Sequence, residues 1–266
     1  MGLRSSTLGA LALSSFAAVA HDGDARKDSN IQVGVRPFFL VEGMDHSRLK
    51  EKLQRCEKGP FRRSDFSIAH RGAPLQFPEH TKESYEAGAR QGAGIVECDV
   101  TFTKDGELVC RHAECDLHTT TNIVATELNN KCSVPWTGPG SSPKCCTSDL
   151  TIDEFKSLRG KMDAANPAAT TAAGFLGGTA SFRTHLYNSR GRLLTLREGI
   201  ALNKRLGVKH TPELKEGDAQ RIMTVFGGQE NYAQRMIDEF KQAGVNPKDV
   251  FAQSFNKNDI LYWIQH

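Results

Sequence analysis

Three short apolar runs between residues 68 and 122 each lead into polar side chains that can do chemistry. These side chains are two histidines, an arginine and two carboxylates: His70, Arg71, Glu97, Asp99 and His112. Short apolar runs of this kind are typical of buried strands. Ligands of α/β proteins bind at the carboxyl ends of parallel strands. The sequence therefore predicts that these residues converge on one site.

The predicted elements alternate between strands and helices. We expect core strands at 66–70, 95–101, 107–112, 208–214 and 250–255, and helices at 79–91, 151–158, 194–206, 218–243 and 259–265. Short strands at 32–35 and 38–41 and a helix at 46–56 are expected to precede them. This order is typical of an α/β fold, and chemically active strand ends favour a TIM (β/α)8 barrel. A doubly wound sheet would need a glycine-rich phosphate loop after the first strand, and residues 70–74 do not form one.

The segment boundaries predict an exported protein. Residues 1–20 combine an early arginine, an apolar run and a small-residue end, which is the pattern of a signal peptide cleaved near Ala20. Residues 21–64 are predicted to form an N-terminal extension, and 65–266 a barrel domain with a cysteine-rich loop at 113–148. No later apolar run is long enough to span a bilayer, so we expect a secreted, extracellular protein. The net charge of +3 is too small to indicate a nucleic-acid partner.

Seven cysteines follow the predicted signal peptide. In an oxidising compartment they are expected to form disulfides, and zinc binding is disfavoured because no CxxC pair occurs. The odd count leaves a thiol unpaired. Cys98 is the candidate, because it alternates with Glu97 and Asp99 and so faces the buried side of its strand. Among the possible pairings, Cys115 with Cys132 is our working hypothesis.

Three carboxylates are candidates for a metal site. Glu97 and Asp99 lie two residues apart on a predicted strand and therefore share one face. Two buried carboxylates repel each other unless a cation lies between them. With Glu213 from another strand end, they suit one hard divalent cation, Mg²⁺ or Ca²⁺.

The remaining candidates are imidazoles and cations. His70 and His112 flank the acidic strand and suit general acid and base catalysis near neutral pH. Arg71 and Lys215 can neutralise the oxygens of a phosphate. A Ser/His/Asp hydrolase is disfavoured because no GxSxG motif occurs.

The same residues form an ordered set of motifs that resembles the glycerophosphodiester phosphodiesterase family, and its secreted fungal members in particular. The matching stretches are 70–73 (HRGA), 78–81 (PEHT), 96–100 (VECDV), 103–106 (TKDG), 111–112 (RH), 117–121 (LHTTT), 195–198 (TLRE), 212–215 (PELK) and 253–255 (QSF).

The resemblance implies a TIM-barrel hydrolase that cleaves a small-molecule glycerophosphodiester into an alcohol and glycerol 3-phosphate. In this family the residues that match His70 and His112 act as acid and base, and the substrate's own glycerol hydroxyl attacks first. The residues that match the three carboxylates hold the metal. Those that match Arg71 and Lys215 contact the phosphate, and Glu79 matches a supporting active-site carboxylate.

The chain departs from the family pattern in three ways. Ala113 stands where an aspartate usually follows the second histidine, which bears on the orientation of His112. His80 stands where asparagine is usual, which bears on the loop beside Arg71. The sequence also supplies only about five of the eight strands of a TIM barrel. We therefore expect an incomplete barrel, either truncated or completed by a partner.

Two other functions compete with this interpretation. A phospholipase D-like enzyme of the spider-toxin type would share the fold, the two histidines and the acidic pair, and would act on sphingomyelin or lysophospholipid. A truncated, non-catalytic copy would at most bind metal or phosphate. The sequence leaves open the identity of the metal, the alcohol group of the substrate and the oligomeric state.

Overall fold

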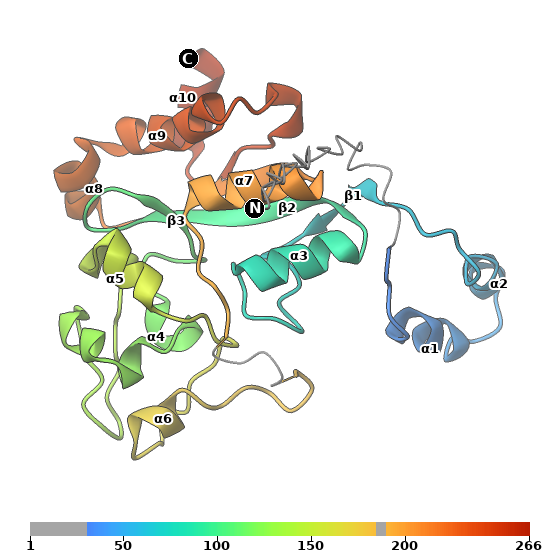
Figure 1. Ribbon diagram of the computed structural model, residues 1–266, viewed down its shortest axis with the longest axis horizontal. Coiled ribbons are helices and arrows are strands. Elements are labelled where there is room, and N and C mark those ends of the chain that lie inside the picture. The colour runs from blue at the N-terminus through green and yellow to red at the C-terminus, as the bar shows by residue number, and fades with distance from the viewer. Residues whose placement is uncertain (1–30, 185–189) are drawn as a thin grey trace, which may run out of the picture.

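The computed structural model describes residues 31–184 and 190–266 (Figure 1). The predicted signal peptide, with its cleavage near Ala20, lies outside these residues. Among the residues described, no helix has the length and apolar character needed to cross a membrane.

The core of the fold is one sheet of five strands. The strands are β1 (Ser64–Ala69), β2 (Ala93–Phe102), β3 (Leu108–Cys110), β4 (Lys209–Leu214) and β5 (Gln253–Ser254). Their order is β1-β2-β4-β5, and these four neighbours are parallel. β3 instead turns back and pairs antiparallel with β2. All five predicted core strands are therefore present, most of them shorter than expected.

β2 is the centre of the sheet, and each of its residues is buried. It pairs with β1 on one side and with β4 on the other. The β2–β4 register places Asp99 directly opposite Glu213. Strand pairing thus brings together two carboxylates that are far apart in the sequence.

The helices cover one face of this sheet. Their bounds are α3 (Lys82–Arg90), α7 (Leu196–Leu206), α8 (Ala219–Phe226), α9 (Gln229–Gln242) and α10 (Lys257–Gln265). α3 and α7 lie side by side against β2, and α9 packs on α7 (Figure 1). The region expected to be a helix at 218–243 forms α8 and α9, which are separated at Gly227 and Gly228, whose positive φ angles of 77° and 144° end one helix before the next begins.

The opposite face of the sheet is open. On β1, Ala69 is buried against the helices, whereas Phe66 and Ile68 point the other way and are 98% and 51% exposed. Phe255, just after β5, is 80% exposed. These apolar side chains are on the side that a closed barrel would enclose, so the sheet forms an arc with an uncovered inner face.

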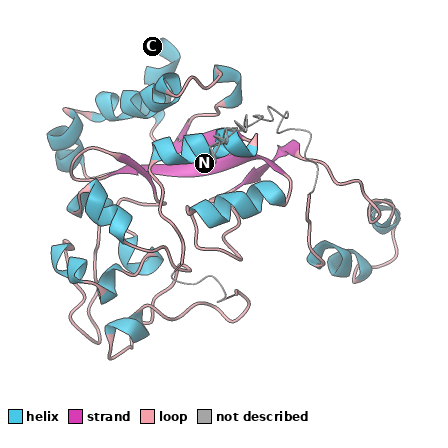
Figure 2. Cartoon of the chain, in the orientation of Figure 1, coloured by secondary structure: helices cyan, strands magenta, loops and turns pink. Residues whose placement is uncertain are grey.

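The segment between β3 and α7 forms a lobe of short helices joined by long loops (Figure 2). Its helices are α4 (Leu117–Thr120), α5 (Ile152–Ser157) and α6 (Ala172–Phe175), with 3-10 turns at Ile123–Ala125, Glu127–Lys131 and Thr147–Asp149. A further 3-10 turn, Pro247–Asp249, precedes β5. The lobe has its own apolar cluster, including Leu117, Ile123, Leu150, Phe155 and Phe175.

Two predictions about the cysteines were wrong. Cys98 does face the buried side of β2, but Cys110 of β3 faces the same side, and the two form a disulfide. Cys56 is the free thiol among the residues described.

The predicted Cys115–Cys132 pair is also wrong. Cys115 pairs with Cys146, and Cys132 pairs with Cys145. Neighbouring residues in an extended segment point in opposite directions, so Cys145 and Cys146 reach different partners.

The N-terminal segment differs from the prediction in part. The expected strands at 32–35 and 38–41 are absent, and α1 (Arg36–Glu42) occupies that region instead. Proline in the first turn of α1 fixes φ at a helical value, which favours the helix over a strand. The helix expected at 46–56 is present as α2 (Arg48–Gln54), capped by Ser47. Both helices lack buried residues, and they stand apart from the sheet (Figure 1).

Candidate active site

The three predicted metal ligands meet on the inner face of the arc. Glu97 and Asp99 project from β2, and Glu213 projects from the paired position on β4. One carboxylate oxygen from each lies within 4.8 Å of the other two, and all three residues are buried. The structure therefore brings together side chains from two strands that the sequence separates by more than a hundred residues.

The charges of this cluster fit a divalent cation. Burial, together with the nearby carboxylates of Asp99 and Glu213, raises the pKa of Glu97 to about 7. Lys215 partly offsets the charge, because its Nζ lies 2.6 Å from Glu213 Oε1 and 4.0 Å from Asp99 Oδ1. Buried carboxyl groups this close together resist being ionised at the same time. Their oxygens are the ligands that Mg²⁺ or Ca²⁺ prefers.

Arg71 lies beside the carboxylates because of a tight turn after β1. Its backbone N–H donates to Glu97 Oε2 at 2.8 Å, and its guanidinium lies 3.2 Å from Glu79 Oε2 and 3.6 Å from Asp99 Oδ2. Gly72 makes the turn possible, because its φ is 90° and a Cβ there would lie 2.3 Å from Ser84 Oγ. Glu79 thus lies where it can hold Arg71 in place.

The two predicted acid–base histidines reach the site from different directions. His70 follows β1, and its Nε2 lies 3.6 Å from Glu97 Oε2, with the side chain 67% exposed. His112 follows β3, which returns antiparallel to β2 and so carries His112 back toward the acidic cluster. Burial lowers the pKa of His112, and the positive charges of Arg71 and Lys215 lower it further, so the neutral imidazole is favoured at pH 7.

These groups line one cavity of about 390 Å³. It is lined by Ile68, His70, Arg71, Glu97, Asp99, His112, Thr211, Glu213, Lys215, Gln253 and Phe255. Seven of the eight residues singled out in the sequence line it. The eighth, Glu79, is buried behind Arg71.

Some side chains around the site were not assigned a role from the sequence. Gln253 Nε2 donates to Glu213 Oε2 at 2.6 Å, and the ring of Phe255 lies beneath Lys215 Nζ at 5.8 Å. Arg111 is fully buried and lies 3.5 Å from Glu79. The sequence contained one signal for Arg111, because it directly precedes His112 in a stretch that matches the family.

The two single-residue departures from the family pattern, Ala113 and His80, each have a structural counterpart. At Ala113, the backbone N–H donates to Asp116 Oδ2 at 3.2 Å, so a carboxylate three residues later contacts this turn. His80 does more than shape the loop beside Arg71: its ring is fully buried and its Nε2 lies 2.8 Å from Asp99 Oδ2.

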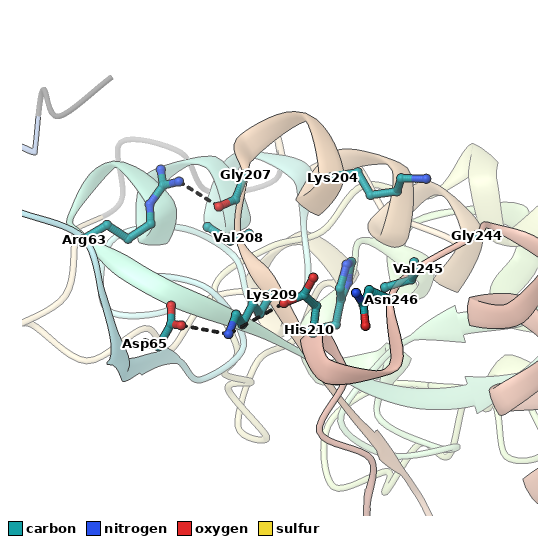
Figure 3. A pocket seen from close by; sticks show the side chains of 11 residues that line it. Arg63, Asp65, Lys204, Gly207, Val208, Lys209, His210, Gly244, Val245 and Asn246 are labelled. Atoms are coloured by element: carbon teal, nitrogen blue, oxygen red, sulfur yellow. Dashed lines mark hydrogen bonds and ion pairs between the residues drawn. The ribbon is translucent and has the colours of Figure 1, made fainter. Parts of the chain in front are cut away.

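A larger cavity, of about 620 Å³, lies at the opposite, amino-terminal end of β1 and β4 (Figure 3). Its cations already have partners. Arg63 donates to the carbonyls of Leu206 and Gly207, and Lys209 pairs with Asp65 at 2.9 Å. Cations that are held by backbone carbonyls and a carboxylate in this way indicate a structural network, despite the larger volume.

The chain matches known proteins along most of its length. The model of the glycerophosphoryl diester phosphodiesterase family matches residues 70–265. A protein of Arthroderma benhamiae named "Extracellular protein" is 43% identical over 106 residues, which cover 40% of this chain and 43% of that protein. Glycerophosphodiester phosphodiesterase GDPD6 of Arabidopsis thaliana is 24% identical over 229 residues, covering 81% of this chain and 57% of that protein. The chain thus spans about half the length of these relatives.

A solved structure supports the fold. The crystal structure of a Silicibacter pomeroyi protein assigned to the glycerophosphoryl diester phosphodiesterases aligns with a TM-score of 0.54 at 18% identity, covering 75% of this chain and 60% of that one. The predicted fold is confirmed: a TIM barrel of the phosphodiesterase type, represented here by a half-barrel of about five strands. By its fold and by the match across residues 70–265, the chain belongs to the glycerophosphoryl diester phosphodiesterase family.

Proposed function

We propose that this chain carries the active site of a metal-dependent phosphodiesterase that hydrolyses glycerophosphodiesters to an alcohol and glycerol 3-phosphate. One observation carries the proposal: three buried carboxylates, two histidines and two cations line a single cavity. A phosphodiester fits this combination, because cations can neutralise its oxygens while imidazoles transfer protons.

The proposed metal site consists of Glu97, Asp99 and Glu213. A divalent cation bound there would polarise the phosphoryl group. Arg71 and Lys215 are proposed to bind the phosphate oxygens and fix the orientation of the ester. Glu79 supports this role by holding the guanidinium of Arg71 through its carboxylate.

The two histidines are proposed to move the protons. Neutral His112 accepts the proton of the attacking hydroxyl, which in this family is the substrate's own glycerol hydroxyl. His70 donates a proton to the oxygen of the departing alcohol. The bond from phosphorus to the glycerol hydroxyl oxygen forms as the bond to the alcohol oxygen breaks. Water then opens the resulting cyclic phosphate, with the histidines in reversed roles.

We also propose that the protein acts outside the cell. The sequence pattern of residues 1–20 and the three disulfides support export, since disulfides persist in oxidising compartments. The name of the Arthroderma benhamiae relative, "Extracellular protein", supports the same proposal.

A second candidate function is binding of metal or phosphate without turnover. Its support is the open inner face of the arc, where His70 is 67% exposed and Phe66 is 98% exposed. Catalysis by electrostatic stabilisation works best where water is excluded. The open arc leaves the proposed general acid, His70, in solvent. This favours binding without turnover, whereas a closed barrel would favour catalysis.

An activity assay separates these functions. The mature chain is incubated with glycerophosphocholine and Mg²⁺ or Ca²⁺, and release of glycerol 3-phosphate is measured, with EDTA and His70→Ala as controls. Turnover that both controls abolish supports the phosphodiesterase. A folded sample that binds the cation without turnover supports the binding protein, and turnover of sphingomyelin or lysophospholipid instead would favour a phospholipase D-like enzyme.

A further inference from the structure

His80 is an unusual residue for a fully buried position. Its side chain has no solvent exposure, yet it carries two polar ring nitrogens. Both nitrogens are used: Nε2 lies 2.8 Å from Asp99 Oδ2, and Nδ1 lies 3.1 Å from the hydroxyl of Tyr85. Tyr85 is itself fully buried. Three side chains from separate segments therefore form a continuous chain that ends on a proposed metal ligand.

The backbone holds His80 in this position at a cost. Its φ is 52°, a left-handed conformation that is uncommon for residues other than glycine. Its N–H donates to the carbonyl of Arg71 at 3.2 Å, and Arg71 also has a positive φ, of 60°. Thr81, the next residue, caps α3. The ring is thus fixed between the turn that presents Arg71 and the start of a helix.

The chemistry of the end groups decides which atoms donate in the series of hydrogen bonds from Tyr85 through His80 to Asp99. Burial and the nearby carboxylates of Asp99 and Glu97 raise the pKa of Tyr85 far above its usual value, so its hydroxyl keeps its proton. That hydroxyl donates to Nδ1 of His80. Nε2 of His80 faces a carboxylate oxygen, which accepts, so Nε2 carries a hydrogen and donates to Asp99 Oδ2. Each polar atom in the chain has a suitable partner.

This arrangement leaves one oxygen of Asp99 for a ligand. Oδ2 is engaged by His80 and faces Arg71 at 3.6 Å, whereas Oδ1 faces Lys215 at 4.0 Å. Without His80, the Asp99 carboxylate could rotate and pair with Arg71 through both oxygens. We propose that His80, oriented by Tyr85, is a positioning residue that fixes the Asp99 carboxylate so that it presents one oxygen to the cation. This inference rests on the proposed function, because it assumes that the cluster binds a metal.

Metal binding tests the inference directly. Ca²⁺ and Mg²⁺ are titrated calorimetrically into the metal-free full chain and into His80→Leu, His80→Gln and Tyr85→Phe. Leucine removes the donor, whereas the amide nitrogen of glutamine can replace Nε2. We expect His80→Leu to raise the Kd for the cation by about 10- to 100-fold, the usual effect of losing a group that orients a metal ligand. His80→Gln should recover most of this loss, and Tyr85→Phe should show a smaller increase than His80→Leu.

A matched control separates positioning from stability. Tyr262 of α10 is half-buried, and its hydroxyl donates to Gln234 Oε1 of α9 at 3.2 Å, away from the cluster. Tyr262→Phe removes this hydroxyl and should leave the Kd unchanged, even if it lowers the melting temperature of the metal-free chain. A Kd for His80→Leu within about twofold of the wild type would overturn the inference.

Two further outcomes also test the proposed role of His80. If His80→Leu does not fold, Tyr85→Phe replaces it. Weaker binding by Tyr85→Phe supports the inference, and unchanged binding overturns it. If the folded wild type binds neither cation, the proposed metal site itself is wrong, and the role of His80 falls with it.

Discussion

The two ends of the sheet both carry clusters of charged side chains, but the clusters differ in how they are paired. At the amino-terminal end, Arg63 donates to two backbone carbonyls and Lys209 pairs with two aspartates. At the carboxyl end, Glu97, Asp99 and Glu213 are buried within a few ångströms of each other, and burial together with this like charge raises the pKa of Glu97 to about 7.

This difference separates a structural network from a candidate binding site. Of these two cavities the amino-terminal one is the larger, so a comparison of their volumes would not have pointed to the carboxyl end. Charges that pair within the protein have no need of a ligand. Buried like charges destabilise the empty site and are stabilised when a cation binds. The crowded like charge is therefore our reason for proposing the carboxyl end as the functional one.

The largest expected effect comes from the proposed general base. We expect His112→Ala to lower kcat about 10²- to 10⁴-fold, since a positioned base contributes about that much. Glycerol 3-phosphate release at saturating substrate measures the change. Cation binding by the same variant should be unchanged. Activity near that of the wild type would show that another residue accepts the proton.

Removal of a metal ligand should have the next largest effect. Glu213→Gln keeps the size of the side chain but removes a charge, and we expect the Kd for Ca²⁺ or Mg²⁺ to rise about a hundredfold or more, beyond the effect of losing a supporting group. Calorimetric titration measures the Kd. Thermal unfolding without metal provides the control, because removing one of three crowded charges should not destabilise the empty chain.

The raised pKa of Glu97 predicts a pH dependence of stability. A carboxyl whose pKa is raised on folding binds more protons folded than unfolded, so the stability of the metal-free chain should fall as the pH rises from about 4.5 to about 7. A shift of this size corresponds to a loss on the order of 3 kcal/mol in the free energy of unfolding. Glu97→Gln should remove most of this fall.

Denaturant unfolding in EDTA at pH 5 and pH 8 measures the effect. Added cation should also reverse the loss at pH 8. Equal pH dependence in the wild type and Glu97→Gln would contradict the pKa assignment.

The smallest effect is expected at the amino-terminal end. Arg63→Met removes two hydrogen bonds to the end of α7 and should lower the free energy of unfolding by about 1–2 kcal/mol. It should leave kcat and cation binding unchanged. A loss of activity in a folded Arg63→Met variant would break the contrast between the two ends and connect the larger cavity to function.

Much of the fold was predictable because local patterns specify it. The five core strands, the break between α8 and α9, and the capped helices follow from apolar runs, glycine pairs and Ser/Thr caps. The error at 32–41 has the same origin, since a run of aromatic and β-branched residues resembles a strand. Proline and the absence of a neighbouring strand favoured α1 there.

The cysteine pairing could not be predicted because it depends on which strands are neighbours. Cys98 was placed correctly on the buried face of β2, but its partner became visible only once β3 folded back beside β2. In the lobe, Cys115 has several possible partners close in sequence. Packing of the loops selected Cys146.

By itself, the sequence determined the family, the alternation of strands and helices, and the residue types at the strand ends. The tertiary structure decided which of these residues meet. Strand register places Asp99 opposite Glu213, and the antiparallel return of β3 brings His112 to the same cavity. The tertiary structure also placed His80 between Asp99 on one side and Tyr85 on the other. The physical reason is that side-chain chemistry is local, whereas distances between strands are set by pairing and packing across the whole chain.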